Sequence, residues 1–103
     1  MIDIKHGVKL DKLQPQMLLV LINVERLWWL HGLSPTLTSG NDGKHRTNSL
    51  HYQGHAIDLR TRDITETRAL FFRDRLKESL GENYDVVLEF DPPHLHIEYD
   101  PKE

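Results

Sequence analysis

Residues 49–60, SLHYQGHAIDLR, hold side chains that could bind a metal ion. His51 and Asp58 lie seven positions apart, with Gly54 and Ala56 between them. Glycine lets the chain turn sharply. Ala56 shares a strand face with Asp58, and its small side chain leaves room beside the carboxylate. A loop histidine and a strand carboxylate could therefore face one ion.

Asp58 lies within an apolar alternation, where an isolated charge is costly. A carboxylate in such a place needs a partner, and a metal cation is a natural one. The alternative is a turn aspartate that pairs with a nearby arginine, Arg60 or Arg62.

A second histidine-rich stretch, DPPHLHIEYD at residues 91–100, lies near the end of the sequence. On a strand, His94 and His96 point to one face, and Leu95 and Ile97 point to the other. The two histidines could serve one metal, or one could bind it while the other transfers a proton. The alternative is a pair of exposed or hydrogen-bonded histidines without a metal.

His51, Asp58 and a histidine of residues 91–100 supply three neutral or anionic ligands from two strands. Three protein ligands with a fourth position left for water are typical of a catalytic zinc site. Structural zinc sites usually have four protein ligands that include cysteine, and this chain has no cysteine. The pattern therefore favours a catalytic metal site.

The composition is that of one globular domain, residues 1–103, with 38% hydrophobic and 28% charged residues. The net charge of -3 argues against a nucleic-acid binder, which usually has a basic face. The first residues, MIDIKHGVKLDK, lack the features of a signal peptide. The apolar run MLLVLI is too short to span a membrane.

The first predicted element is a helix at residues 17–30, with Pro15 in its first turn and Gly32 as its C-terminal cap. Its apolar stripe is wide, which predicts a largely buried helix. We therefore interpret Trp28 and Trp29 as core and edge-of-core residues.

Residues 33–39 and 56–60 each predict a short strand. Residues 39–50, which lie between them, contain almost nothing apolar and predict a loop. Long ordered loops in compact domains are often functional.

A second helix is predicted to begin at Asp63, with Glu66 in capping-box register, and to end at Gly81. Residues 84–90 and 94–99 predict two strands joined by a tight connection. This order predicts an α+β fold in which a small, mainly antiparallel sheet is covered by helices. The apolar face of the second helix is predicted to consist of Ala69, Phe72, Leu76 and Leu80.

The pattern SxHxxGxAxD at residues 49–58, followed by HxH at residues 94–96, resembles the D-alanyl-D-alanine carboxypeptidase family of zinc peptidases. This family includes the VanX and VanY enzymes, the penicillin-insensitive murein endopeptidase and the L-alanyl-D-glutamate endolysins of phages. It is related in fold to the sonic hedgehog signalling domain. The resemblance extends over roughly residues 36–99. It implies a hedgehog-like fold, bound Zn²⁺, and a small phage or prophage member of the family.

The resemblance implies that His51, Asp58 and one tail histidine are the zinc ligands. In members with HxH the second histidine binds zinc and the first lies beside the attacking water. This favours His96 as ligand and His94 as general base or transition-state stabiliser. In endolysin-like members a carboxylate three residues before a single histidine is the base, which would select Asp91 and make His94 the ligand.

Glu89 is a further candidate carboxylate, because it lies at the end of the preceding predicted strand. The chain also departs from the family. Many members have a serine-glycine-x-arginine stretch whose arginine holds the substrate carboxylate or the oxyanion, and residues 39–42 here read SGND. The positive charge would then come from Lys44, His45 or Arg46, of which we select Arg46.

The function implied is zinc-dependent hydrolysis of a peptide bond in bacterial cell-wall peptides, with zinc-activated water as nucleophile. The alternative is a non-catalytic zinc-binding module of the same fold that binds cell wall or a protein partner. We expect a monomer whose partner is a peptidoglycan peptide, with neither nucleic acid nor membrane involved. Without a signal peptide, such an enzyme would be made in the bacterial cytoplasm and act after release, or be carried by the virion.

Overall fold

The computed structural model describes residues 1–42 and 50–101 and has an α+β architecture. Within these residues, five strands form one mixed sheet in the order β1-β2-β3-β5-β4. β1 and β2 run parallel, whereas the other neighbouring strands run antiparallel. The elements are β1 (Asp3–Ile4), α1 (Gln16–Leu30), β2 (Thr36–Ser39), β3 (Ala56–Arg60), α2 (Glu66–Leu80), β4 (Tyr84–Phe90) and β5 (Pro93–Tyr99).

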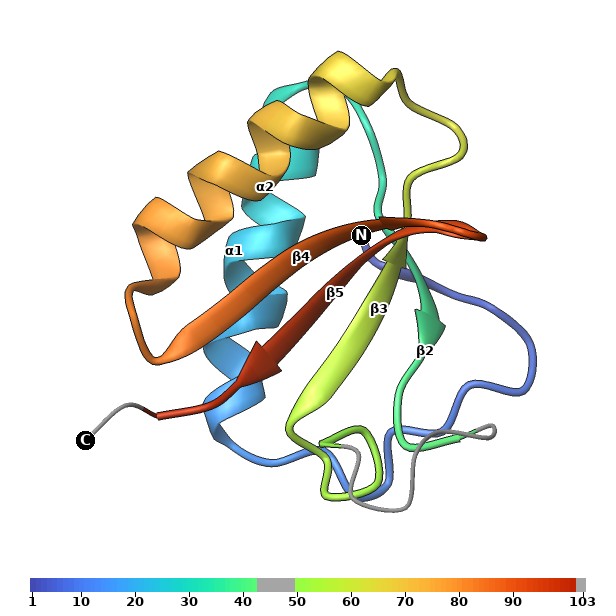
Figure 1. Cartoon of the computed structure of the whole chain (residues 1–103). Coiled ribbons are helices and arrows are strands. Elements are labelled where there is room, and N and C mark those ends of the chain that lie inside the picture. Colours follow the sequence, from blue (N-terminus) through green and yellow to red (C-terminus); the bar gives the residue numbers. More distant parts are fainter. Residues whose placement is uncertain (43–49, 102–103) are drawn as a thin grey trace.

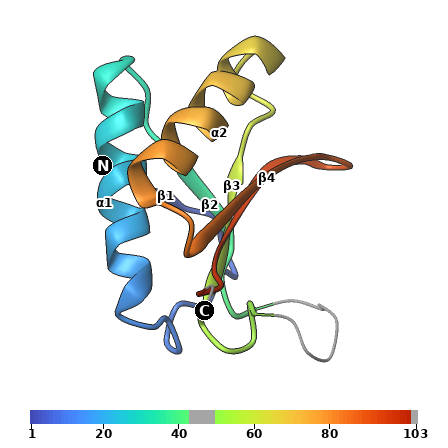
Figure 2. The same cartoon turned by 60° about the vertical axis from the view of Figure 1, so that its left-hand side comes forward.

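Both helices cover the same face of the sheet (Figures 1 and 2). The predicted apolar face of α2 is confirmed, because its four residues are all buried. At the centre of the core, the rings of Trp28 in α1 and Phe72 in α2 lie 4.4 Å apart. Beneath them, Ile57 of β3 and Ile97 of β5 are fully buried. No helix in the described part of the chain covers the opposite face of the sheet.

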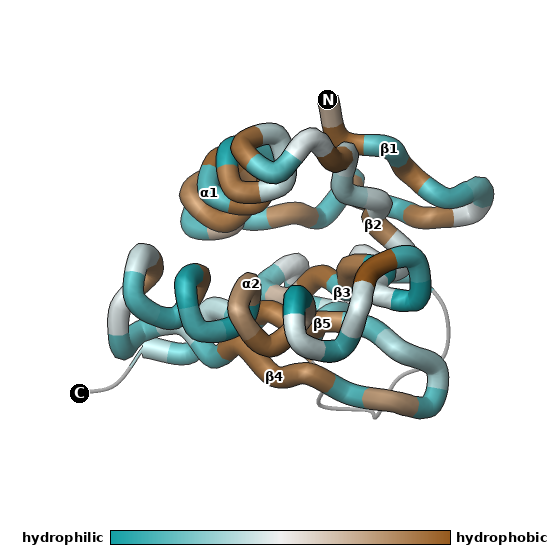
Figure 3. Tube along the Cα trace, turned by 90° about the horizontal axis from the view of Figure 1, so that it is seen from above, coloured by the Kyte–Doolittle hydropathy of each residue, from teal (hydrophilic) through white to brown (hydrophobic). Residues whose placement is uncertain are grey.

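α1 is not largely buried, so this expectation was wrong. The helix rests on the sheet through one side only, and among the described residues nothing covers its other side. Trp28 is 2% exposed, whereas Trp29 is 70% exposed. Hydrophobic residues extend around much of α1 in Figure 3. The exposed apolar residues of this helix are Leu18, Leu19, Ile22, Trp29 and Leu30.

The N-cap of α2 lies two residues later than Asp63, where the helix was predicted to begin. Its N-cap is Thr65, whose hydroxyl oxygen accepts a hydrogen bond from the backbone N–H of Arg68 at 3.1 Å. Asp63 instead lies in the turn before the helix, so Glu66 occupies the first helical position. Gly81 ends the helix as predicted. An N-cap threonine three residues before its N–H donor satisfies one of the free amides of the first turn.

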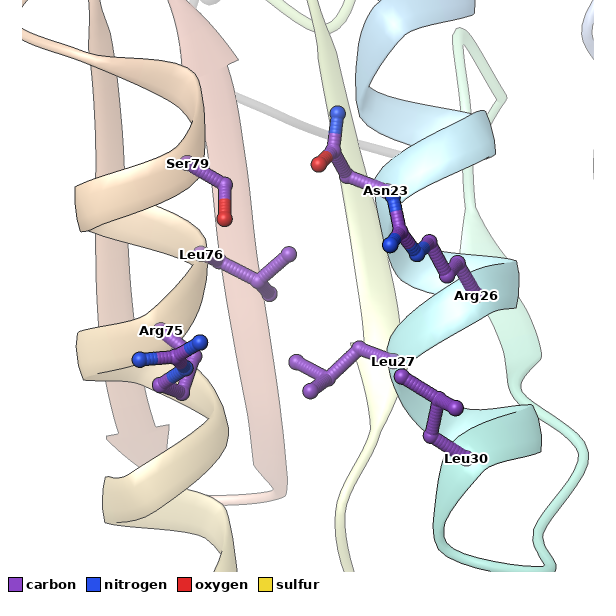
Figure 4. Close-up of a pocket in the computed structure, with 7 residues that line it drawn as sticks. All are labelled: Asn23, Arg26, Leu27, Leu30, Arg75, Leu76 and Ser79. Atoms are coloured by element: carbon purple, nitrogen blue, oxygen red, sulfur yellow. The ribbon is translucent and has the colours of Figure 1, made fainter.

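The two helices are separated by a shallow groove (Figure 4), in which Leu27 of α1 and Leu76 of α2 point toward each other. Arg26 and Arg75 lie along its rim. The groove is on the helical side of the sheet and shares no residue with the histidine-rich stretches. Neither helix in the described part of the chain has the length and apolar character needed to cross a membrane.

Candidate metal centre

Three side chains from the two histidine-rich stretches meet on the sheet face that the helices leave uncovered. Nδ1 of His96 lies 3.0 Å from Oδ1 of Asp58 and 3.1 Å from Nε2 of His51. Nε2 of His51 lies 3.3 Å from the same carboxylate oxygen. These three residues form a group that could hold a metal ion.

Strand pairing brings Asp58 and His96 together. In the antiparallel β3–β5 ladder, Asp58 lies directly opposite His96, and Ile57 lies opposite Ile97. Since side chains alternate across a strand, the buried isoleucines direct Asp58 and His96 to the other face. Residues directly opposite on antiparallel strands have Cβ atoms about 4.5–5.5 Å apart, so these two side chains are in reach of one ion.

His51 reaches the cluster from the turn before β3, and Gly54 allows this turn. The φ of Gly54 is 75°, and its N–H donates to the carbonyl oxygen of His51 at 3.0 Å. A Cβ at this position would overlap the carbonyl oxygen of Lys12. The N–H of Gln14 donates to the carbonyl of Gly54, which ties the turn to the segment before α1. Both the turn and the close approach therefore require glycine.

The Gly40 carbonyl fixes the orientation of the His51 ring. His51 is 3% exposed, and its Nδ1–H donates to the carbonyl oxygen of Gly40 at 2.8 Å. Gly40 packs so closely on Lys9 that a Cβ would overlap the Lys9 carbonyl. The carboxylate of Asp42 accepts hydrogen bonds from the N–H groups of both Gly40 and Lys9. Because Nδ1 carries the proton, the lone pair of Nε2 faces the cluster.

The second ring nitrogen of His96 is held by Glu98, which sequence reasoning missed. Nε2 of His96 lies 2.7 Å from Oε1 of Glu98. The two residues share a strand face because they are two positions apart on β5. That spacing was visible in HIE at residues 96–98 and could have identified Glu98.

The charges of Asp58 and His96 support each other. Burial opposes the charge on Asp58, but hydrogen bonds with His51 and His96 outweigh burial and hold the pKa of Asp58 well below its ordinary 3.8. Burial would also lower the pKa of His96, but hydrogen bonds with Asp58 and Glu98 raise it from 6.5 to about 9. Without a metal, His96 is therefore a cation between two carboxylates at neutral pH.

The donor set fits a small divalent cation in number, type and spacing. A tetrahedral zinc ion with ligands at about 2.0–2.1 Å separates its ligand atoms by roughly 3.3 Å. The three donor separations here are 3.0, 3.1 and 3.3 Å. An ion could therefore replace the proton of His96 at the centre of the three donors with little movement of the side chains.

His94 and Glu89 lie beside the cluster on the same face of the sheet. They are opposite each other in the β4–β5 ladder, with Nε2 of His94 3.3 Å from Oε1 of Glu89. Nδ1–H of His94 donates to the carbonyl oxygen of Pro92 at 2.6 Å. Nε2 also lies 4.0 Å from Oδ1 of Asp58. The structure thus gives His94 a carboxylate partner and a place next to the three candidate ligands.

The predicted alternative base, Asp91, is not part of this group. Asp91 lies in the turn between β4 and β5, is exposed, and forms no hydrogen bond or ion pair with a described residue. Lys44, His45 and Arg46 lie outside the described residues. The ring of His55 contacts Tyr99 at 5.6 Å and is not one of the three cluster residues.

Arg60 supplies a cation that sequence reasoning considered only as a partner for Asp58. Arg60 lies opposite His94 in the β3–β5 ladder. It comes two positions after Asp58 on β3, so both side chains point to the same face of the sheet. Its side chain is half-buried and forms no hydrogen bond or ion pair within residues 1–42 and 50–101. The described part of the sheet face therefore combines candidate metal ligands, a histidine–glutamate pair and a guanidinium without a described partner.

Comparison with known proteins adds no relative: no protein-family model matches this chain, and no curated protein matches it.

Proposed function

We propose that this protein is a zinc peptidase that hydrolyses a peptide bond in bacterial cell-wall peptides. The observation that carries the proposal is the convergence of His51, Asp58 and His96, with donor separations of 3.0 to 3.3 Å. These are the positions that serve as zinc ligands in the D-alanyl-D-alanine carboxypeptidase family, which the sequence resembles. Two nitrogens and one carboxylate oxygen are typical of catalytic zinc, which keeps a fourth position for water.

The chemistry that a bound zinc ion supplies is acidification of a water molecule and polarisation of a carbonyl group. His94 acts as the general base. Its Nδ1–H is held by the Pro92 carbonyl, so its Nε2 can take the proton of the attacking water and return it to the leaving amine. Glu89, 3.3 Å from this nitrogen, stabilises the imidazolium that forms.

Arg60 is proposed to bind a carboxylate of the substrate. It faces the same side of the sheet as Asp58 and lies beside His94. A guanidinium matches the geometry of a carboxylate through two parallel hydrogen bonds. The preferred substrate is therefore a peptide with a free carboxylate near the scissile bond.

The proposal is tested by digesting purified peptidoglycan with the zinc-loaded protein and identifying the released muropeptides by mass spectrometry. Hydrolysis should require zinc and should be lost in His51→Ala. His55→Ala is the matched control, because His55 belongs to the same motif but lies outside the cluster. Equal hydrolysis by the chelated protein or by His51→Ala would reject a zinc peptidase.

One observation favours a second candidate, a zinc-binding module without catalysis. Asp42 stands where the family has its arginine, and its carboxylate holds the backbone of Gly40 and Lys9 instead of a substrate. A non-catalytic module would bind zinc and retain affinity for cell wall or a protein partner, yet release no muropeptide. The digestion experiment separates the two candidates.

A further inference from the structure

We propose that Glu98 is a positioning residue that selects Nδ1 of His96 as the metal donor. This inference rests on the metal site of the proposed function, and it assigns a role to a residue outside the three ligands. Glu98 acts through the imidazole ring and not on the substrate.

The geometry of β5 brings Glu98 to the far side of the His96 ring. The two residues are two positions apart on β5. Ile97 between them and Leu95 before them are fully buried, so His96 and Glu98 both point away from the core. Oε1 of Glu98 lies 2.7 Å from Nε2 of His96, which is the distance of a charge-assisted hydrogen bond. Nε2–H donates to this carboxylate, which leaves Nδ1 to face Asp58 and His51.

An imidazole ring without such a partner could present either nitrogen to the metal. The carboxylate removes this freedom, because rotating the ring by half a turn would break the 2.7 Å contact and withdraw Nδ1 from Asp58, 3.0 Å away. A carboxylate that accepts the second N–H of a metal-binding histidine also raises the basicity of the ligand. Glu98 therefore sets both the direction and the strength of the His96 donor.

The surroundings of Glu98 keep its carboxylate on His96. Its side chain is 22% exposed, and Asp85 lies opposite it in the β4–β5 ladder. Carboxylate oxygens of Asp85, Glu98 and Asp100 lie within 4.8 Å of one another. Ionised carboxylates only accept hydrogen bonds, so neither aspartate offers Glu98 a donor, and the imidazole N–H of His96 is its favourable partner.

His51 offers an internal comparison. Its second nitrogen donates to the neutral carbonyl oxygen of Gly40, whereas that of His96 donates to a charged carboxylate. The site therefore has one histidine oriented by the backbone and one oriented by a side chain. Only the second can be altered by substitution without changing the backbone.

The test compares zinc affinity, measured by competition with a chromophoric chelator at one fixed pH, in the full-length protein and its variants. Glu98→Ala should weaken zinc binding by about tenfold to a hundredfold. Glu98→Gln keeps an oxygen that accepts the N–H, so its loss should be smaller than that of Glu98→Ala. Glu82→Gln, which removes an exposed charge in the turn before β4 and outside this acidic group, is the control and should bind zinc as the wild type does.

Nitrogen chemical shifts of the imidazole rings provide a second measurement that needs no variant. In the zinc-loaded wild type, His96 should show a metal-bound Nδ1 and a protonated Nε2. A metal-bound Nε2, or unchanged zinc affinity in folded Glu98→Ala, would overturn the inference. Neither measurement depends on peptide hydrolysis, so a protein that binds zinc in this way but cuts no muropeptide would refute the peptidase and leave the role of Glu98 intact.

Discussion

Asp58 and His96 face each other across two antiparallel strands, and Oδ1 of the aspartate lies 3.0 Å from Nδ1 of the histidine. This pair is the centre of the candidate metal site. His51 approaches it from a turn, and Glu98 and His94 flank it on β5. The consequences for metal binding, pH dependence and catalysis can each be measured.

Replacing Asp58 with asparagine should abolish tight zinc binding. The substitution removes the anionic ligand, so the loss of affinity should exceed the roughly tenfold to hundredfold typical of a residue that only orients a ligand. Isothermal titration calorimetry measures the effect. Asp63→Asn, in the turn before α2 and away from the cluster, is the control. Zinc affinity near that of the wild type in Asp58→Asn would remove this aspartate from the ligand set.

Zinc binding should release a proton from His96 at neutral pH. The pKa of this histidine is about 9 in the metal-free protein, so its Nδ1 is protonated below that pH and must lose the proton before it can bind a metal. Zinc affinity should therefore rise with pH up to about 9. Titrations at one pH in buffers of different ionisation enthalpy give the number of protons released. Zinc binding without proton release at neutral pH would contradict the predicted deprotonation of His96.

The metal-free protein should be most stable in mildly acidic solution. The lowered pKa of Asp58 stabilises the fold above its ordinary value of 3.8, and this contribution is lost as the pH falls. The raised pKa of His96 stabilises the fold fully below its ordinary 6.5, and this contribution is lost as the pH rises through about 9. Thermal unfolding in the presence of a chelator, followed by circular dichroism, measures the loss of stability at both acid and alkaline pH.

The loss of stability at alkaline pH can be assigned to His96 by substitution. His96→Gln should flatten the decline in stability between pH 6.5 and about 9. His55→Gln should leave that decline in place, because His55 is paired with Tyr99 and not with Asp58. An unchanged decline in His96→Gln would assign it to another group.

Replacing His94 with alanine should lower kcat and leave zinc bound. A positioned general base typically contributes about a hundredfold to ten-thousandfold in rate. Glu89→Gln should cause a smaller loss, because Glu89 acts only by stabilising the charged form of His94. Asp91→Asn should have no effect, since Asp91 is exposed and without a described partner. If His94→Ala loses zinc and Asp91→Asn loses activity, the endolysin-like assignment holds instead.

Replacing Arg60 with glutamine should raise KM for peptides with a free terminal carboxylate. The loss of one charged hydrogen-bonded contact corresponds to about tenfold to a hundredfold. A substrate whose terminal carboxylate is amidated should show little difference between wild type and variant. Arg62→Gln is the matched control, because Arg62 lies beyond β3 and is exposed. An equal effect on both substrates would assign Arg60 a structural role.

Local patterns in the sequence were enough to predict several elements and the residues of the candidate metal site. The apolar face of α2 from Ala69 to Leu80 follows from helical spacing, and the β4–β5 hairpin follows from two alternating runs around a proline turn. The alternation in residues 94–97 also placed His94 and His96 on the face opposite to the buried Leu95 and Ile97. Such features depend on neighbours within a few positions of one another, so they can be read without the tertiary structure.

Tertiary structure decided the features that depend on distant parts of the chain. β1 exists because it pairs with β2, and the outer side of α1 is exposed because no element within residues 1–42 and 50–101 packs on it. The register of β3 against β5 sets Asp58 opposite His96 and Arg60 opposite His94.

The close packing of the N-terminal segment on Gly40 and Gly54 delivers the ring of His51 to the same point. The sequence by itself therefore determined which side chains could bind a metal. Only the pairing of distant strands decided that their donor atoms lie 3.0 to 3.3 Å apart, because register and loop packing are properties of the whole fold.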